Sequence, residues 1–432
     1  MKRIILSSLL LLIMLSGLFA QDAKKLKTYL DAKQFDKAKA EVDAAILKNP
    51  ADPVALYYKS KVYAELAADP QFKASVPDAR EQAFDAFKKA VDTDKENKVF
   101  LLLTQDRYKP IFDVYQGYYD AGVIAFNSGA NGNKADFDQA LTLFKNSDMV
   151  GRYIFSKKWA LSEIDTQLVL TVGKAAINAG KKEEAVIWLK KLADANITGT
   201  LNDKTSYQLP YQWLSFYYKD AKDDANFLKY ISLGKKNFPK DDYYDAVMLD
   251  YYRDKKDYDA LFKKYDEIVA AYPDSMQYHF NYANEGFIYI YNSDAGTKIN
   301  NKETLLKNVG IELQKALAIK PNDINTNWML GQYYYNAGID VKEMANLVRG
   351  TKPEDVKKKA DLNAQAKEIF SKAIPYADKA LSTLEGSNKK SDKSKYKSIV
   401  DLMQRIYSSL NQSDKAKSYQ VKYDTADARF VN

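Results

Sequence analysis

The strongest constraint on this chain is a recurring segment in which a helical run ends at proline followed by polar residues. Pro239 ends one such segment, Pro273 lies 34 residues later, and Pro321 lies 48 residues further on. Asn49-Pro50 near the start has the same form. Proline ends a helix because it lacks a backbone N–H and restricts the residue before it. Recurrence at this spacing predicts a series of similar helical units.

Composition agrees with helices and not with an all-β fold. The 432 residues are 46% hydrophobic and 28% charged, with only 17 Gly and 11 Pro to form turns. A chain of this length exceeds one compact core of ordinary size, which favours several domains or a repeat array. The 33 tyrosines suit half-covered helices, because a tyrosine ring can pack inward while its hydroxyl reaches water.

One segment carries a fuller repeat pattern. Leu330 and Gly331 form a pair, Tyr334 follows three residues after the glycine, and Gly338 follows four residues after that. This pattern resembles the repeat unit of the tetratricopeptide family, and together with the leader described below the chain resembles an exported bacterial tetratricopeptide-repeat protein. The resemblance implies an all-α fold: an α-solenoid of antiparallel two-helix hairpins, wound as a right-handed superhelix with irregular insertions.

A second match begins at Val172-Gly173 and continues through Ala176 and Gly180. A small residue is needed where two helices of a hairpin cross closely. Large residues at i, i+4 and i+7 of the following helix would cover the next hairpin. Second helices of this kind are predicted to begin near Phe35, Phe137, Glu184 and Ser413.

The chain is accordingly divided into three predicted segments. Residues 1–20 form a signal peptide, and residues 21–340 form tetratricopeptide-like repeats with irregular units near 98–166. The polar run Asn292–Thr304 reads as an insertion between two repeats. Residues 341–432 form C-terminal repeats after a Lys-rich insertion.

The first residues have the pattern of an export signal. Lys2 and Arg3 precede the apolar run Ile4–Phe19, and the small residue Ala20 precedes a polar continuation. We expect cleavage after Ala20 and a periplasmic, or secreted, mature protein that does not span a membrane. An uncleaved anchor is the alternative, although the apolar run falls short of the roughly 20 residues that span a bilayer.

The residues needed for common catalytic and metal sites are scarce. The chain has no cysteine and one histidine, His279, whose aromatic neighbours favour a packed structural role over that of a catalytic base. Paired acids such as Asp223-Asp224 read as helix caps. Positive and negative charges are interleaved despite the net charge of +8, which disfavours nucleic-acid binding. We therefore expect no enzyme activity, catalytic residue, cofactor or metal.

The family resemblance also implies a partner-binding groove lined by set positions of each first helix. Amide side chains there could bind the backbone of an extended peptide while aromatic rings cover its apolar side chains. The alternative is that the aromatic side chains belong to the inter-helix core. The implied groove residues are Gln277, Phe280, Asn284, Phe287, Asn325, Trp328, Gln332 and Tyr335.

The function that this implies is an exported scaffold that binds a protein or peptide partner in its groove. The family's carboxylate-binding charge clamp is not expected, because Phe280 and Trp328 stand where such a clamp would place lysine. One alternative is an envelope carbohydrate-binding or hydrolytic protein that uses the aromatic groove. Another is a structural spacer with no groove ligand.

Overall fold

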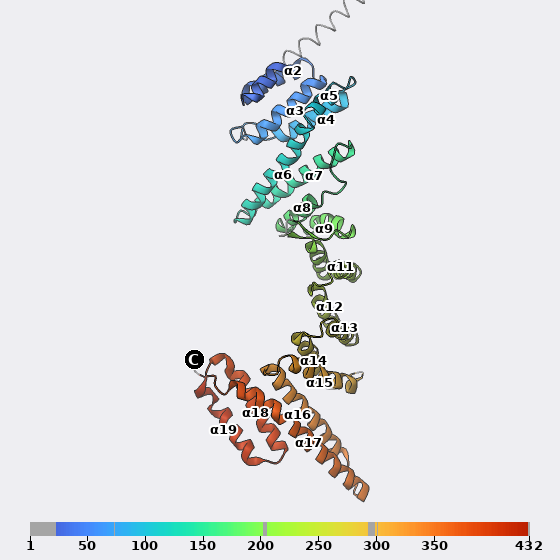
Figure 1. The fold of residues 1–432 in the computed structure, drawn as a ribbon, viewed down its shortest axis with the longest axis vertical. Helices are drawn as coiled ribbons and strands as arrows, with labels where there is room; N and C mark the ends of the chain where they lie inside the picture. The colour runs from blue at the N-terminus through green and yellow to red at the C-terminus, as the bar shows by residue number, and fades with distance from the viewer. Residues whose placement is uncertain (1–22, 73, 202–204, 293–298, 300, 431–432) are drawn as a thin grey trace, which may run out of the picture. The chain divides into compact units, whose positions relative to one another are not determined.

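The computed structural model describes residues 23–430 except 73, 202–204, 293–298 and 300. The predicted signal peptide therefore lies outside the described residues, and so does much of the predicted insertion Asn292–Thr304. The described chain divides into two compact units at Tyr244 and Asp245. Each unit is built almost entirely of helices (Figure 1).

The first unit begins with a helical segment, residues 23–31, and continues through helices that form consecutive antiparallel pairs. Its elements are α2 (Phe35–Lys48), α3 (Pro53–Ala68), α4 (Ala79–Thr93), α5 (Lys98–Gln105), α6 (Lys109–Ala130), α7 (Asp136–Ser156), α8 (Thr166–Asn178), α9 (Lys182–Asp194), α10 (Gln208–Asp220) and α11 (Asp224–Asn237). Strands β1 (Thr200–Leu201) and β2 (Thr205–Ser206) form a short antiparallel pair before α10. Helix α12 (Tyr243–Asp254) begins at the end of this unit.

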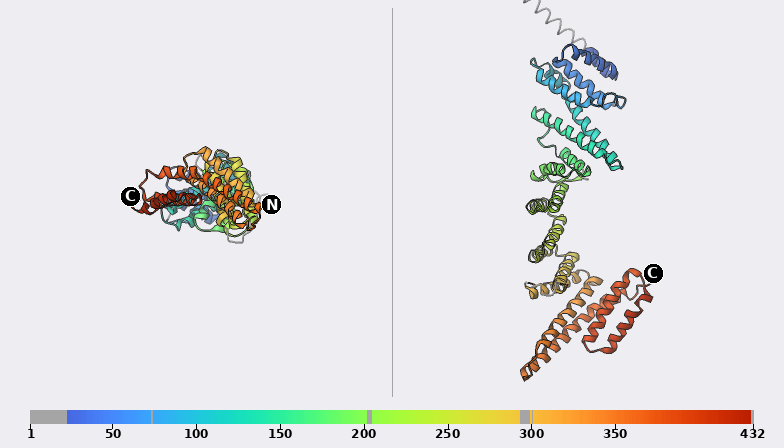
Figure 2. Two further views of the ribbon diagram at one scale, coloured as in Figure 1. Left: turned by 90° about the horizontal axis from the view of Figure 1, so that it is seen from below. Right: turned by 180° about the vertical axis from the view of Figure 1, so that it is seen from behind.

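The second unit continues the same pairing of neighbouring helices. Its elements are α13 (Tyr258–Ala271), α14 (Met276–Asn292), α15 (Lys302–Ile319), α16 (Ile324–Leu347), α17 (Pro353–Leu384), the short 3₁₀ turn η1 (Lys390–Asp392), α18 (Lys393–Ser409) and α19 (Ser413–Arg429). Helices α14 with α15, α16 with α17 and α18 with α19 pack as hairpins, which Figure 2 shows from behind. The predicted fold class, an α-solenoid of two-helix hairpins, is confirmed.

Aspartate caps mark where many of these helices begin. The Asp52 carboxylate accepts hydrogen bonds from the backbone N–H groups of Val54 and Ala55, and Pro53 occupies the first turn of α3. Asp223 likewise accepts from the Asn226 N–H at 3.1 Å. Such caps satisfy backbone donors that have no partner inside the helix. The prediction that Asp223 is a capping residue is confirmed.

The two helices of a hairpin can cross closely where one of them has a glycine. Gly173 of α8 faces Leu189 of α9, and a Cβ on the glycine would lie 2.5 Å from a Leu189 methyl carbon. Ala176 and Leu189 are fully buried in the same interface. The second helices predicted near Phe35, Phe137, Glu184 and Ser413 are also confirmed as α2, α7, α9 and α19.

The regions predicted to be irregular contain helices of unusual length. Helix α5 is a short additional helix, whereas α6 and α7 are 22 and 21 residues long. The predicted segment boundary after residue 340 falls inside α16, and the Lys-rich segment continues as the first half of the 32-residue α17. The insertion therefore lengthens one hairpin instead of separating two. No helix among the described residues is long and apolar enough to cross a membrane.

Candidate partner-binding surface

The eight residues predicted for the groove lie on two first helices of the second unit. Gln277, Phe280, Asn284 and Phe287 are on α14; Asn325, Trp328, Gln332 and Tyr335 are on α16. Only Gln277 and Asn325 are well exposed, and the other six are half-buried. Among the described residues, no hydrogen bond, ion pair or ring contact joins the group on α14 to the group on α16. Their role in binding a partner remains a prediction.

The aromatic members of this set contact the core of the unit. Phe280 and Phe287 pack against the buried cluster that contains Tyr282 and Leu305. Trp328 packs against buried side chains of α17 and α18, and its indole N–H is buried without a hydrogen-bond partner. The Tyr335 ring lies 5.6 Å from that of Phe370, between centroids. These contacts indicate that much of each ring belongs to the inter-helix core and not to an open groove.

The amide members are partly engaged with neighbouring side chains. The Gln277 amide donates to Asn281 Oδ1 at 2.7 Å on the same helix. Asn325 Oδ1 accepts from the Lys395 ammonium of α18 at 2.6 Å. Both bonds are exposed to solvent, so water or a peptide backbone could replace either partner at small cost.

A different surface, in the first unit, combines exposure with a hollow. It lies between the turn that joins α8 to α9 and the outer side of α10, and we call it the α8–α10 surface. The hollow has a volume of about 100 Å³ and is lined by Ile177, Gly180, Lys182, Trp213, Phe216, Tyr217 and Asp220.

Aromatic side chains form the floor of the α8–α10 surface. The rings of Trp213 and Tyr217 stack with 5.5 Å between centroids and 16° between planes. The Phe216 side chain beside them is 59% exposed. On the same helix Tyr211, Leu214 and Tyr218 are buried, because they face the core. Phe216 therefore contributes little to the core and presents an apolar ring to solvent.

Charged groups form the rim of the hollow. Lys182 and Asp220 lie 3.6 Å apart across it, and both are well exposed. Such a pair stabilises the fold little, but it remains available to the backbone or side chains of a bound segment. On α8, burial lowers the pKa of Lys174, whose side chain is half-buried.

Hydrogen bonds join the first helices of neighbouring hairpins in this part of the chain, including α8 and α10. Tyr115 of α6 donates to the Asp165 carboxylate at the start of α8, and Tyr207 donates to Thr166 Oγ1 at 2.8 Å. Gln212 of α10 donates to Asp241 at 2.8 Å. The Gln212 amide is thus already used within the fold.

Sequence reasoning did not select Trp213 or Phe216. One signal in the sequence could have located them. Leu214-Ser215 occupies the same position in α10 that Val172-Gly173 occupies in α8, and both Ser215 and Gly173 are buried. Aligning the two pairs would have placed Phe216 directly after the crossing point. Helical periodicity alone does not say which aromatic residue of a tyrosine-rich helix is left uncovered.

The sequence matches no known family model and no curated protein. Solved structures that are similar to the chain include tetratricopeptide-repeat proteins. A TPR repeats protein from Bacteroides fragilis is 16% identical, covering 70% of this chain and 98% of its own, with a TM-score of 0.28. The TPR2AB domain of yeast Sti1, in a pHSP90 complex, is 13% identical. That match covers 84% of this chain and 98% of the Sti1 chain, with a TM-score of 0.24. A human IFIT1 dimer with m7Gppp-AAAA is 16% identical. That match covers 85% of this chain and 90% of the IFIT1 chain, with a TM-score of 0.22.

Proposed function

We propose that the chain is a protein-interaction scaffold whose α8–α10 surface binds an apolar side chain of a partner. The supporting observation is Phe216: a large ring, mostly exposed, beside the stacked Trp213 and Tyr217 and over a hollow. Aromatic residues, phenylalanine included, are enriched at protein interfaces relative to the rest of the protein surface. A surface of this kind binds and orients a partner and performs no chemistry.

The size and lining of the hollow restrict what binds there. A volume of about 100 Å³ admits one aliphatic or aromatic side chain and little else. The backbone on either side of that side chain would run past Lys182 and Asp220, whose charges can bond to its carbonyl and N–H groups. The partner is therefore a protein segment presenting leucine, isoleucine, methionine or phenylalanine between polar residues.

The second unit offers a separate region that could contact a partner. Gln277 and Asn325 present amides at its surface, and the half-buried Phe280, Phe287, Trp328 and Tyr335 leave part of each ring uncovered. We keep the predicted groove as a second region of contact, subordinate to the α8–α10 surface because more of its aromatic area is packed in the core.

We further propose that the scaffold acts outside the cytoplasm. Lys2, Arg3 and the apolar run Ile4–Phe19 support export, with cleavage after Ala20 and a periplasmic or secreted product. N-terminal sequencing of the protein recovered from the periplasm tests this. A first residue of Gln21 supports it, whereas an intact Met1 in the membrane fraction contradicts it.

Selection from a displayed library of random peptides tests the binding proposal. Selected peptides should share one aliphatic or aromatic residue, and Phe216→Ser should weaken their binding at least tenfold. Ile187→Ser is the matched control, because Ile187 is 61% exposed but lies on the second helix α9. Equal effects of the two substitutions, or selection of charged peptides alone, would contradict the proposal. Binding of glycans in place of peptides would favour the carbohydrate alternative.

A further inference from the structure

The hairpin of α16 and α17 continues past the packed part of the second unit. Among residues 341–365, Ala345 is the only buried residue. Figures 1 and 2 agree that this end of the hairpin extends beyond α18 and α19, which flank only its inner part. Among the described residues of this unit, no other helix flanks this end in either figure. The distal hairpin is thus stabilised mainly by contact between its own two helices.

Apolar side chains are exposed at this end. Leu347 is 74% exposed and Met344 is 56% exposed at the end of α16; Val356 is 58% exposed in the first turn of α17. Burying any one of them would be favourable, because water is removed from apolar surface. Their concentration at a projecting end indicates a contact surface.

Positive charge accompanies this apolar end. Residues 344–353 include Arg349 and Lys352 and no acidic residue. Lys357, Lys358 and Lys359 follow within the first two turns of α17. None of these five cations forms an ion pair among the described residues, so all remain available to an anionic surface.

Acidic residues at the same end reduce this charge without cancelling it, because the five cations stand against only Glu343, Glu354 and Asp355. Glu343 and Glu354 flank the segment on either side. The Asp355 carboxylate contacts the backbone of Gly350, where a Cβ would overlap it. This packing fixes the loop between the helices and directs the Asp355 carboxylate into that loop.

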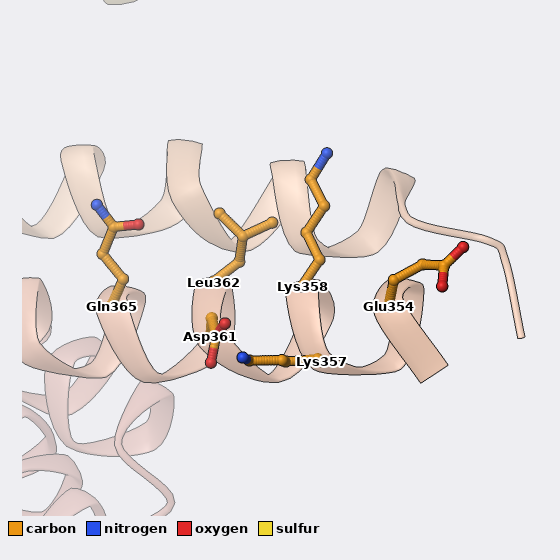
Figure 3. A pocket seen from close by; sticks show the side chains of 6 residues that line it. All are labelled: Glu354, Lys357, Lys358, Asp361, Leu362 and Gln365. Atoms are coloured by element: carbon orange, nitrogen blue, oxygen red, sulfur yellow. The ribbon is translucent and has the colours of Figure 1, made fainter. Parts of the chain in front are cut away.

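The flank of α17 differs from the end. A surface hollow of about 360 Å³ is lined by residues of this helix alone. Figure 3 shows the side chains of Lys358, Leu362 and Gln365 pointing to the same side of the helix. Glu354, Lys357 and Asp361 complete the lining. This mixed charged lining suits a solvated face, and the exposed Met344 and Leu347 lie at the end of the hairpin instead.

We propose that the end of the α16–α17 hairpin, Met344–Pro353, binds the surface of an anionic phospholipid bilayer. Leu347 and Met344 enter the boundary between head groups and acyl chains, and Arg349 and Lys352 contact lipid phosphates. A projecting end with apolar and basic side chains suits a flat anionic surface, where each basic residue adds to binding. This contact is separate from partner binding at the α8–α10 surface.

Vesicle co-sedimentation tests the proposal. The protein used is residues 21–432, which contain every described helix and omit the apolar leader that would itself enter lipid. It should sediment with vesicles of phosphatidylglycerol and phosphatidylcholine in a one-to-two ratio, and much less with phosphatidylcholine alone. Binding should fall as salt is raised, because salt screens exposed charges.

Two double variants separate the apolar and basic contributions. Met344→Ser with Leu347→Ser, and Arg349→Gln with Lys352→Gln, should each weaken vesicle binding on the order of tenfold or more. Matched controls are Ile187→Ser with Val421→Ser, both 61% exposed, and Lys89→Gln with Lys417→Gln, both exposed. Circular dichroism should be unchanged in all four, since the altered side chains are exposed.

Three results would overturn the proposal: no sedimentation with the anionic vesicles, equal binding to both kinds of vesicle, or equal losses in hairpin and control variants. Loss of a protein partner in the hairpin variants, without any vesicle binding by the unaltered protein, would assign the end to a protein instead. Phe216→Ser should leave vesicle binding intact, so failure of the α8–α10 proposal is distinguishable from failure of this one.

Discussion

The imidazole of His279 bridges the Glu312 carboxylate and the backbone carbonyl of Pro273. Its Nδ1 is hydrogen-bonded to Glu312, and its Nε2 lies 2.8 Å from the Pro273 oxygen. The residue is 1% exposed, and Lys315 donates to the other Glu312 oxygen at 2.8 Å. His279 thereby joins α14 to α15 and to the turn before α14, which agrees with the structural role predicted for it.

His279→Ala should lower the free energy of unfolding by about 3 kcal/mol, because it leaves a buried carboxylate with one of its partners removed. Urea unfolding followed by circular dichroism measures this. Gln277→Ala, on the exposed side of the same helix, should change the value by less than about 0.5 kcal/mol. A similar small change for His279→Ala would show that the bridge does not stabilise the fold.

Gly173→Ala should destabilise the first unit by about 1–3 kcal/mol, since the new methyl group would meet Leu189. Adding Leu189→Ala should relieve that overlap. The double variant should therefore lose less free energy of unfolding than the sum of the losses in the two single variants. Additive losses in thermal or urea unfolding would mean that the two helices do not cross at Gly173.

Trp328→Ala should lower the free energy of unfolding by about 3–5 kcal/mol, because the ring contacts buried side chains of α17 and α18. Gln332 lies one turn away and is half-buried, so Gln332→Ala should lower the free energy of unfolding by less than about 1 kcal/mol. Urea unfolding of both variants distinguishes the roles. An unchanged stability in Trp328→Ala, with loss of peptide binding, would instead assign the ring to the partner.

Stability should fall in alkaline solution as buried tyrosines ionise. Burial raises the pKa of Tyr63, Tyr118 and Tyr265 to about 12, against about 10 in an unfolded chain. The stabilisation from these neutral phenols is complete below pH 10 and is lost as pH rises from about 10 through 12. Urea midpoints at pH 8 and pH 11 test this. Phenolate absorbance that titrates uniformly near pH 10 in the folded protein would contradict it.

The repeat units could be predicted because their signals are local. Pro239, Pro273 and Pro321 each follow the end of a second helix, as their recurrence indicated. Gly173 marked a crossing because only a missing side chain admits Leu189 there. These features depend on residues within one hairpin, so spacing in the sequence captures them.

Other features depend on contacts that spacing does not contain. Helix α17 continues from the Lys-rich segment into the C-terminal repeat, where an insertion between them was expected, so its 32-residue length was not predicted. The groove residues were inferred from family positions, yet Trp328 packs against helices from later repeats. Phe216 was missed because exposure is decided by which neighbouring helix covers a given face.

Photo-crosslinking at position 216 tests the proposed partner surface most directly. A photoreactive phenylalanine analogue would replace Phe216 in one protein and Ile187 in another, and both would be irradiated in a periplasmic extract of the source cells. We expect a defined adduct with a single protein from position 216 and none from position 187. No adduct at 216, or the same adducts at both positions, would contradict binding at the α8–α10 surface.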